Sequence, residues 1–218
     1  MMKIDTGKWK SFALGKLFKI EKGKRLTKAD MREGEINFVG ASAMNNGITT
    51  KIGNAEHLHP ANTITVSYNG SVGEAFYQDA PFWASDDINV LYPRFKLTKE
   101  IAFFMIPYIR AIGKRYAFVD KWQKEVMEKD CILLPAIDKD TPDYKVMEEY
   151  IKLREDKVKS LVDALQFVVG NTMSHSSGGE PRSRTLVQDV PSRRQQLQRQ
   201  SRLVHEGRET FLGVSGVI

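Results

Sequence analysis

The hydrophobic pattern of the first two thirds of the chain predicts short strands mixed with helices. Thr63 to Tyr68 alternates between apolar and polar residues, and Ile88 to Tyr92 is a short, mostly apolar run. Both patterns are typical of β-strands. From Glu100 to Ile112, apolar residues recur at three- and four-residue spacing, which predicts an amphipathic helix capped by Thr98. Cys131 to Leu134 predicts another strand.

A second pattern begins after Thr141-Pro142. From Asp143 to Val169 no glycine or proline interrupts the chain. This predicts one helix roughly 40 Å long, at about 1.5 Å per residue. Such a helix is too long to pack fully on one small domain, so we expect part of its apolar side to contact a partner or a second copy. The residues of that side are Met147, Ile151, Val158, Leu161 and Leu165.

The composition changes again near residue 170. Residues 1–169 hold 20 Lys and 6 Arg, whereas residues 170–218 hold no Lys and 7 Arg, and only one aromatic residue, Phe211. Such a segment cannot bury enough apolar surface to offset its ordering entropy, so we expect it to be largely disordered. Two origins stay open, a natural basic linker and a frameshift or fusion junction. The predicted parts are therefore 1–139, 140–169 and 170–218.

Length and charge restrict the class of protein. The 218 residues include 33 basic and 27 acidic side chains, a formal charge of +6, and 41% are hydrophobic. That is enough for one globular domain with extensions. No apolar run approaches the roughly 18 residues of a membrane helix, and the N-terminus lacks the apolar stretch of a secretory signal. With Cys131 as the only cysteine, these features predict a soluble protein of the reducing cytoplasm, without a membrane.

The sequence carries little that suggests catalysis. It has no Gly-x-x-x-x-Gly-Lys-Ser/Thr loop, no Gly-x-Ser-x-Gly, no His-Glu-x-x-His and no Pro-Pro-Tyr. Pro142-Asp143 and Glu155-Asp156-Lys157 fit the letters of a PD-(D/E)xK nuclease. On one helix, however, the carboxylates of Asp143 and Glu155 would lie about 18 Å apart, too far to share a metal. We therefore predict no catalytic residues.

Metal binding is not expected either. The His57-Leu58-His59 pair lies in a polar loop beside Pro60, where histidines are usually solvated or hydrogen-bonded. Asp86-Asp87 follows Ser85, a sequence more typical of a turn or helix cap than of a metal site.

Two basic clusters suggest an anionic partner. Between Lys16 and Lys28 six basic residues stand against one acid, Glu21. Such a loop suits DNA phosphates, although a solvated surface is the alternative. The second cluster interleaves with Tyr116, Phe118 and Trp122, a mixture found both at nucleic-acid surfaces and at the edges of cores. The candidate phosphate contacts are Lys22, Lys24, Arg25, Lys28, Lys114, Arg115 and Lys121.

Two Asn-Gly sequences would place short polar side chains at loop tips. Asn pairs bidentately with adenine in the major groove, and Ser is a tolerant base or phosphate contact. Asn-Gly is also the strongest short-range hairpin signal, so spacing alone favours turns over base readers. The candidate base-reading residues are Asn45, Asn46, Tyr68, Asn69 and Ser71.

Taken together, these blocks resemble the target recognition domain of the DNA specificity subunits of type I restriction-modification systems. The resemblance covers residues 9 to about 165. The block from Thr63 to Pro93 is its most specific part. The matching stretches are Trp9 to Gly23, Gly40 to Ile48, Thr63 to Gly73, Ala75 to Asp87, and Asn89 to Pro93.

The resemblance implies a mixed α/β (α+β) recognition domain with several short strands, followed by one long spacer helix and the disordered tail. In that family the domain reads one half of a split target in double-stranded DNA, and the helix docks methyltransferase subunits. The chain itself would be noncatalytic and without a cofactor. S-adenosylmethionine, and Mg and ATP, would belong to the methyltransferase and to an endonuclease or motor subunit.

The family's subunit usually carries two recognition domains and two spacer helices, and this chain has one of each. It is therefore a natural half-subunit, a component that forms a homodimer, or the product of a truncated gene. Two other functions stay open. One is the recognition fragment of a fused type II restriction-methylation enzyme. The other is a noncatalytic protein that binds the methyltransferase through its long helix without reading DNA. Irregular loops have no transferable code, so the sequence does not give the bases recognised.

Overall fold

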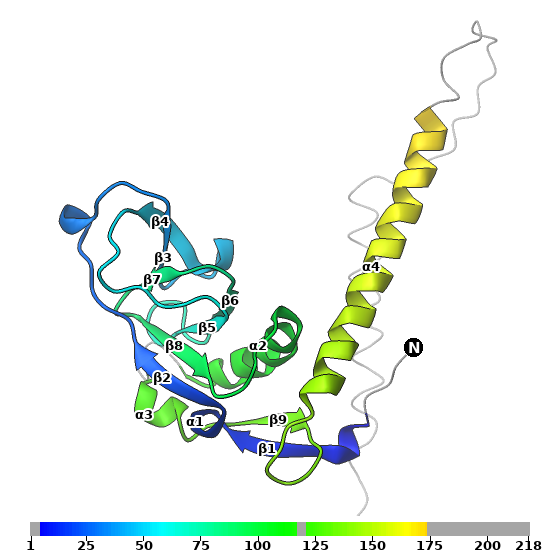
Figure 1. Ribbon diagram of the computed structural model, residues 1–218, viewed down its shortest axis with the longest axis horizontal. Helices are drawn as coiled ribbons and strands as arrows, with labels where there is room; N and C mark the ends of the chain where they lie inside the picture. The colour runs from blue at the N-terminus through cyan, green and yellow to red at the C-terminus, as the bar shows by residue number, and fades with distance from the viewer. Residues whose placement is uncertain (1–4, 117–120, 174–218) are drawn as a thin grey trace, which may run out of the picture. The chain divides into compact units, whose positions relative to one another are not determined.

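The computed structural model describes residues 5–116 and 121–173 (Figure 1). The chain divides into two units, Met1–Phe167 and Val168–Ile218, and all packing given below lies within the first. Most of the tail predicted for residues 170–218, together with Phe118 of the second basic cluster, lies outside the described residues.

The strands form three sheets. A two-stranded antiparallel ribbon has the order β1-β9, a four-stranded antiparallel sheet has the order β2-β8-β5-β6, and a three-stranded sheet has the order β4-β3-β7, in which β3 and β7 run parallel. Their bounds are β1 Trp9–Ala13, β2 Phe18–Lys22, β3 Ile36–Val39, β4 Ile48–Ile52, β5 Thr63–Ser67, β6 Ala75–Gln78, β7 Phe82–Ala84, β8 Ile88–Pro93 and β9 Cys131–Pro135.

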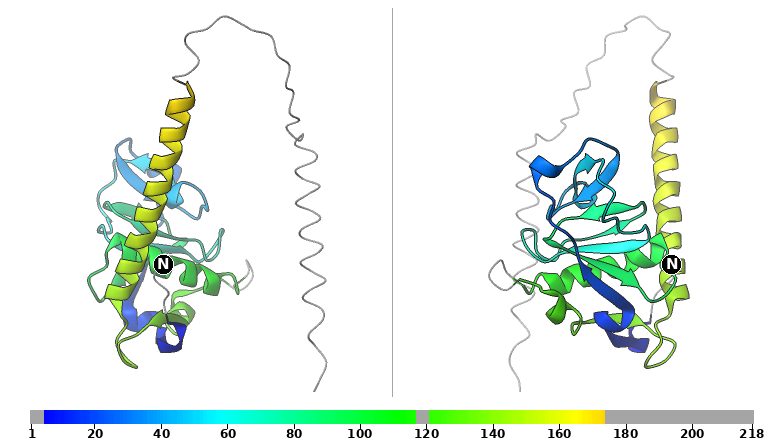
Figure 2. Two further views of the ribbon diagram at one scale, coloured as in Figure 1. Left: turned by 90° about the vertical axis from the view of Figure 1, so that its right-hand side faces the viewer. Right: turned by 60° about the vertical axis from the view of Figure 1, so that its left-hand side comes forward.

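The four-stranded sheet is covered on both faces. Every residue of β5 is buried, and the alternation predicted from the sequence sends Ile64 and Val66 into the main core. On β8, Leu91 joins the same core, whereas Val90 packs into a second cluster with Val39 of β3 and residues of β7. The helix α2 therefore lies against one face of this sheet and the three-stranded sheet against the other (Figures 1 and 2).

The predicted amphipathic helix is α2, Lys99–Gly113, and it continues through Pro107. The Thr98 hydroxyl accepts a hydrogen bond from the Ile101 amide (3.3 Å), so the predicted cap is confirmed. The remaining short elements are single turns. They are η1 Thr6–Lys8, α1 Leu14–Leu17, η2 Lys28–Asp30, η3 Asn45–Gly47 and α3 Lys124–Met127.

The predicted long helix is also present, as α4, Tyr144–Met173. Asp143 precedes it and accepts a hydrogen bond from the Val146 amide (3.1 Å), so this carboxylate caps the helix. The buried contacts of α4 lie in its first two turns, where Met147 is fully buried and Ile151 is half-buried against the core. Every described side chain from Lys152 to Phe167 is exposed.

This position corrects part of the predicted partner face of the helix. Met147 and Ile151 were expected to face a partner, but the domain's own core uses them, because the helix begins directly beside that core. Val158, Leu161 and Leu165 remain exposed, by 60%, 56% and 65%. The predicted fold class, a mixed α/β domain followed by one long helix, is confirmed. Among the described helices none is long and apolar enough to cross a membrane.

Candidate nucleic-acid interface

The connection between β5 and β6 is the point where the predicted site residues meet. This segment, called here the 68–73 loop, runs from Tyr68 to Gly73. It closes an antiparallel hairpin, with the Gly73 amide donating to the Ser67 carbonyl oxygen (2.8 Å) and the Ser67 hydroxyl to the Asn69 carbonyl oxygen (2.5 Å). These bonds give the loop one backbone path. Its neighbours on three sides are the elements that carry the other candidates.

The first neighbour is the segment that joins β3 to β4, called here the 40–47 loop. The Ser71 hydroxyl donates to the Ala41 carbonyl oxygen (3.3 Å), so the two loops lie side by side. Each predicted Asn-Gly turn connects two strands that pair antiparallel, β3 with β4 and β5 with β6. The turn interpretation is thus confirmed.

The 40–47 loop is shaped by its own amides. Asn45 and Asn46 have backbone φ angles of 49° and 54°, in the left-handed region that Asn tolerates better than most residues. The side-chain nitrogen of Asn45 donates to the Ile48 carbonyl oxygen (3.1 Å), and that of Asn46 to the Tyr77 carbonyl oxygen (3.0 Å). Both amides are thus engaged in holding the turn.

The second neighbour is the basic segment after β2. Lys22 Nζ lies 4.9 Å from the centre of the Tyr68 ring. Contact with Tyr68, followed by the nearby carboxylates of Asp86 and Asp87, raises the pKa of Lys22, so this side chain stays cationic. Arg25 reaches Asp86 at 3.7 Å. The end of β2 and the 68–73 loop therefore form one charged surface.

Lys24 and Lys28 follow β2 along the chain. The Lys24 amide donates to the Ala84 carbonyl oxygen (2.9 Å), and Trp83 Nε1 donates to the Lys24 carbonyl oxygen (2.8 Å). These two bonds fix the backbone, while the exposed Lys24 ammonium lies beside His57. Lys28 is exposed on η2.

The third neighbour is the C-terminus of α2. A Cβ atom on Gly73 would lie 2.7 Å from the Gly113 backbone, so only glycine allows the loop and the helix to approach so closely. Lys114 and Arg115 follow directly and are exposed, as is Lys121. The structure thus brings cations to both sides of the 68–73 loop.

Two aromatic residues of the second basic cluster, Tyr116 and Trp122, belong to the core edge. Trp122 is fully buried and stacks on Tyr116 at 5.5 Å. The Trp122 indole N–H and the Tyr116 hydroxyl both donate to Asp130 Oδ2, at 2.6 and 2.8 Å. These rings hold the segment that carries the cations and are not free to stack on bases.

Two of the base-reading candidates face inward. Tyr68 is 6% exposed and its hydroxyl donates to the Asp86 carbonyl oxygen (2.6 Å). The Asn69 side-chain nitrogen donates to Asp87 Oδ1 (2.7 Å). Both side chains therefore position the loop, and contact with a base would require them to leave these partners. Whether Asn45, Asn46 or Ser71 touches DNA stays a prediction.

The groups considered for metal or catalysis have structural partners. His59 is buried, stacks on Phe82 and shares a hydrogen bond with the Tyr92 hydroxyl (2.5 Å); burial lowers its pKa. Glu155 pairs with Lys99 at 3.6 Å, away from the capping carboxylate of Asp143. Within residues 5–116 and 121–173, no group of three or more His, Cys, Asp or Glu is arranged to hold a metal.

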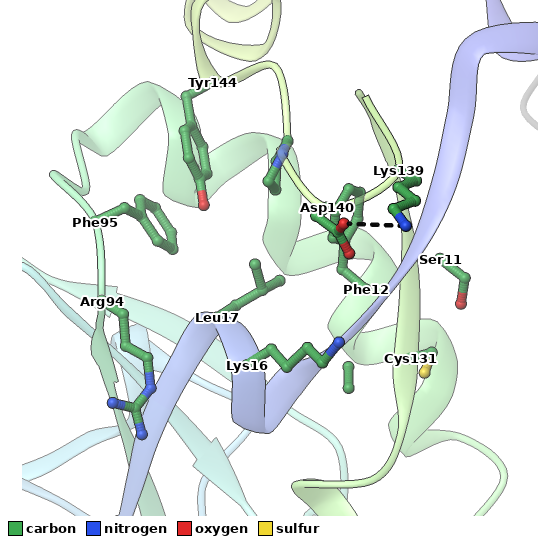
Figure 3. A pocket seen from close by; sticks show the side chains of 12 residues that line it. Ser11, Phe12, Lys16, Leu17, Arg94, Phe95, Cys131, Lys139, Asp140 and Tyr144 are labelled. Carbon is green, nitrogen blue, oxygen red and sulfur yellow. Dashed lines mark ion pairs between the residues drawn. The ribbon is translucent and has the colours of Figure 1, made fainter. Parts of the chain in front are cut away.

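A hollow of about 310 Å³ lies where α4 joins the domain (Figure 3). The rings of Phe95 and Tyr144, which both line it, stack on each other with their centroids 4.2 Å apart. Burial raises the pKa of Tyr144 to about 12. Lys16 and Arg94 also line the hollow. The stacked pair anchors the first turn of α4 and so sets the direction in which the helix leaves the domain.

Comparisons with known proteins agree with this arrangement. Residues 6–162 match the model of the type I restriction modification DNA specificity domain. Over 154 residues the chain is 39% identical to the specificity subunit S.BcgI of a type II restriction enzyme from Heyndrickxia coagulans, covering 69% of this chain and 44% of that protein.

Two crystal structures share the fold. One is the S subunit of a type I restriction-modification system from M. genitalium, with a TM-score of 0.50 and 16% identity, covering 74% of this chain and 43% of the other. The other is the HsdS subunit from Thermoanaerobacter tengcongensis, with a TM-score of 0.51 and 17% identity, covering 72% and 40%. The chain thus spans less than half the length of the relatives it matches.

Proposed function

The chain belongs to the family of type I restriction modification DNA specificity domains, and from this premise we propose that it reads one half of a split target in double-stranded DNA. The observation that carries the proposal is the position of the cations. Lys22 lies over the ring of Tyr68 at one end of the 68–73 loop, and Arg25 pairs with Asp86, whose carbonyl oxygen accepts a hydrogen bond from the Tyr68 hydroxyl. Lys114 and Arg115 follow Gly113, which packs against Gly73 at the other end of the loop.

Each cation on this surface has a simple task. Phosphates are contacted by Lys and Arg irrespective of sequence, and these contacts set the orientation of the protein on the duplex. With the sugar-phosphate backbone of the DNA held by these cations, the 40–47 and 68–73 loops would face the base edges. In this arrangement the loops carry the specificity and the cations supply most of the affinity.

The exposed part of α4 supports a second proposal, that the chain binds a partner protein. Val158, Leu161 and Leu165 leave an apolar side uncovered in the unit that contains them. Contiguous apolar surface of this kind marks a protein contact. We assign it to a methyltransferase subunit, or to a second copy that contributes the other half-site.

The chemistry would then belong to the partners. A bound methyltransferase would flip the target adenine out of the stack and methylate it from S-adenosylmethionine, and an endonuclease or motor subunit with Mg and ATP would cut unmodified DNA. This chain would contribute binding and orientation in the cytoplasm and no catalytic group. Methylation by the chain alone would contradict this division.

The test is a salt titration of binding to random and selected duplexes, with the chain alone and then with the methyltransferase encoded beside it. We expect the mixture to enrich a short motif. We also expect the affinity for random DNA to fall steeply with salt, because each neutralised phosphate releases counterions. In a variant with Lys22, Lys24 and Arg25 changed to Ala, the slope of log affinity against log salt should become shallower by about three units, one for each lost phosphate contact.

Two results would favour other functions. If the chain binds the methyltransferase but no DNA, it is an interaction protein acting through α4. If it binds DNA at all salts without enriching a motif, the loops do not read sequence. A matched variant with Lys10, Lys145 and Lys157 changed to Ala separates the candidate surface from general positive charge, because these three exposed lysines lie on β1 and α4.

A further inference from the structure

Met44 is the most exposed large hydrophobic residue among the described residues. Its side chain is 75% exposed, compared with 71% for Ile137 and Phe167, the next in order. It belongs to the 40–47 loop, one residue before the two asparagines. The asparagines stand out in the sequence as an Asn-Gly turn, whereas the methionine stands out only in the structure.

The loop holds the Met44 backbone in place. The Met44 amide donates to the Ser42 hydroxyl (3.1 Å), and the Gly47 amide donates to the Met44 carbonyl oxygen (2.9 Å). The asparagines on its C-terminal side are engaged with the Ile48 and Tyr77 carbonyl oxygens. The amide nitrogens of these two exposed residues are thus engaged by the protein, and Met44 is the large apolar group that the turn presents to solvent.

The 40–47 loop joins β3 and β4, an antiparallel pair within the three-stranded sheet. In the proposed complex the side chains of this loop would meet base edges in the major groove, where all four base pairs are distinguishable. A thioether is only a weak acceptor and cannot read a hydrogen-bonding base edge. In the major groove, thymine alone among the four bases presents an apolar group, its C5-methyl.

We propose that Met44 is a specificity-determining residue that recognises the C5-methyl group of a thymine in the target. The inference rests on the proposed function, because it requires the 40–47 loop to enter the major groove. It assigns base reading in this loop to an apolar contact, with Asn45 and Asn46 as the residues that position it.

The test removes the methyl group from the DNA and the thioether from the protein. In the half-site selected by the full chain with its methyltransferase, each thymine is replaced by uracil in turn, and dissociation constants are measured. One replacement should weaken binding about fourfold, the value expected for one buried methyl group. With Met44→Ala the same thymine and uracil duplexes should bind equally. Met44→Leu should keep most of the preference.

Two controls separate folding from recognition. Met44→Ala keeps the backbone hydrogen bonds, so its melting temperature should match that of the parent chain. Ile137→Ala removes an equally exposed side chain between β9 and α4, and should leave the thymine preference unchanged.

The remaining outcomes each overturn the assignment. If no thymine-to-uracil replacement changes the dissociation constant, no group reads a thymine methyl. If a replacement weakens binding by the same factor in the parent chain and in Met44→Ala, another group reads it. Equal weakening of all duplexes by Met44→Ala would mean a wedge or a nonspecific contact. Failure of the parent chain to select any motif overturns the proposed function itself, and is seen before any variant is made.

Discussion

At the scale of single residues, Asn46 tests whether the shape of the 40–47 loop matters for specificity. Its backbone has a φ of 54° and its side-chain nitrogen donates to the Tyr77 carbonyl oxygen. Asn46→Ala should destabilise the loop by about 1–2 kcal/mol, since alanine disfavours the left-handed conformation and cannot replace the hydrogen bond. We expect the ratio of selected to random DNA affinity to fall while random binding persists.

Asn46→Gly is the matched variant, because glycine keeps the backbone conformation and removes only the amide. If both variants retain the parent ratio, Asn46 has no part in recognition. If only Ala loses it, the conformation of the loop is what matters.

Lys24 tests the phosphate assignment at one position. Its ammonium is exposed while its backbone is fixed by Trp83 and Ala84. Lys24→Ala should weaken binding to all sequences alike, and the slope of log affinity against log salt should become shallower by about one unit. Lys10→Ala, on β1, should leave the slope unchanged. A loss confined to the selected half-site would instead make Lys24 a base contact.

His59 should make the stability of the domain depend on pH. Burial lowers its pKa, so the unfolded state binds the proton more readily than the folded state. Its contribution to stability is therefore present above the ordinary pKa of about 6.5 and is lost as the pH falls towards the lower folded value. We expect the free energy of unfolding to decrease below about pH 6.5, by at most about 1.4 kcal/mol per pH unit from this group.

Urea unfolding between pH 7.5 and pH 5 checks this expectation. His59→Gln should flatten the dependence. An identical pH profile in the parent chain and His59→Gln would exclude His59 as the source.

At the scale of elements, α4 combines two roles that its sequence does not separate. Met147 and Leu161 lie on the same predicted apolar side, but the first is buried in the domain and the second is 56% exposed. Met147→Ala should lower the free energy of unfolding by about 2–5 kcal/mol, the usual cost for a buried methionine. Leu161→Ala should change it by less than about 0.5 kcal/mol.

The exposed residues Leu161 and Leu165 should matter for partners instead. Leu161→Lys combined with Leu165→Lys should abolish binding to the methyltransferase or to a second copy, measured by analytical ultracentrifugation of the mixture and of the chain alone. Unaltered assembly in both samples would show that this side of α4 is not an interface.

Elements with a strong local pattern were predictable. β5, β8, α2 and α4 follow from alternation or helical spacing, and Thr98 and Asp143 cap their helices through side chains that are visible in the sequence. The shorter strands β3, β6 and β7 were not assigned, because three or four residues give no period and their pairing is set by distant partners. The parallel pairing of β3 with β7 has no local signal at all.

The candidate site shows the same limit. The types and clusters of residues were visible, but which way a side chain turns was not. Tyr68 was a candidate base reader, and Trp122 fitted either a nucleic-acid surface or a core edge. Both are buried, and the polar atom of each bonds to a carbonyl oxygen or a carboxylate further along the chain. Met44 was not predicted as a site residue, because the sequence does not show whether an apolar residue in a turn is buried or exposed.

At the scale of the whole molecule, the domain and the tail should be separable. The predicted tail contributes 7 of the 33 basic residues and none of the described packing. A chain ending at Met173 should therefore melt within about 2 °C of the full chain, since a change of 1 kcal/mol would already shift a domain of this size by about 2–4 °C. Differential scanning calorimetry of both chains gives the comparison. A large drop would mean that the tail is part of the folded unit.

The contact between Gly73 and Gly113 has a consequence for anyone who wishes to retarget this protein. Because a Cβ at either position would meet backbone, the loop and the end of α2 can change in sequence only around a fixed pair of glycines. A graft that replaces residues 69–72 and keeps both glycines preserves the contact between the loop and α2. In libraries that vary position 73, most variants would be unable to pack the hairpin loop against the helix.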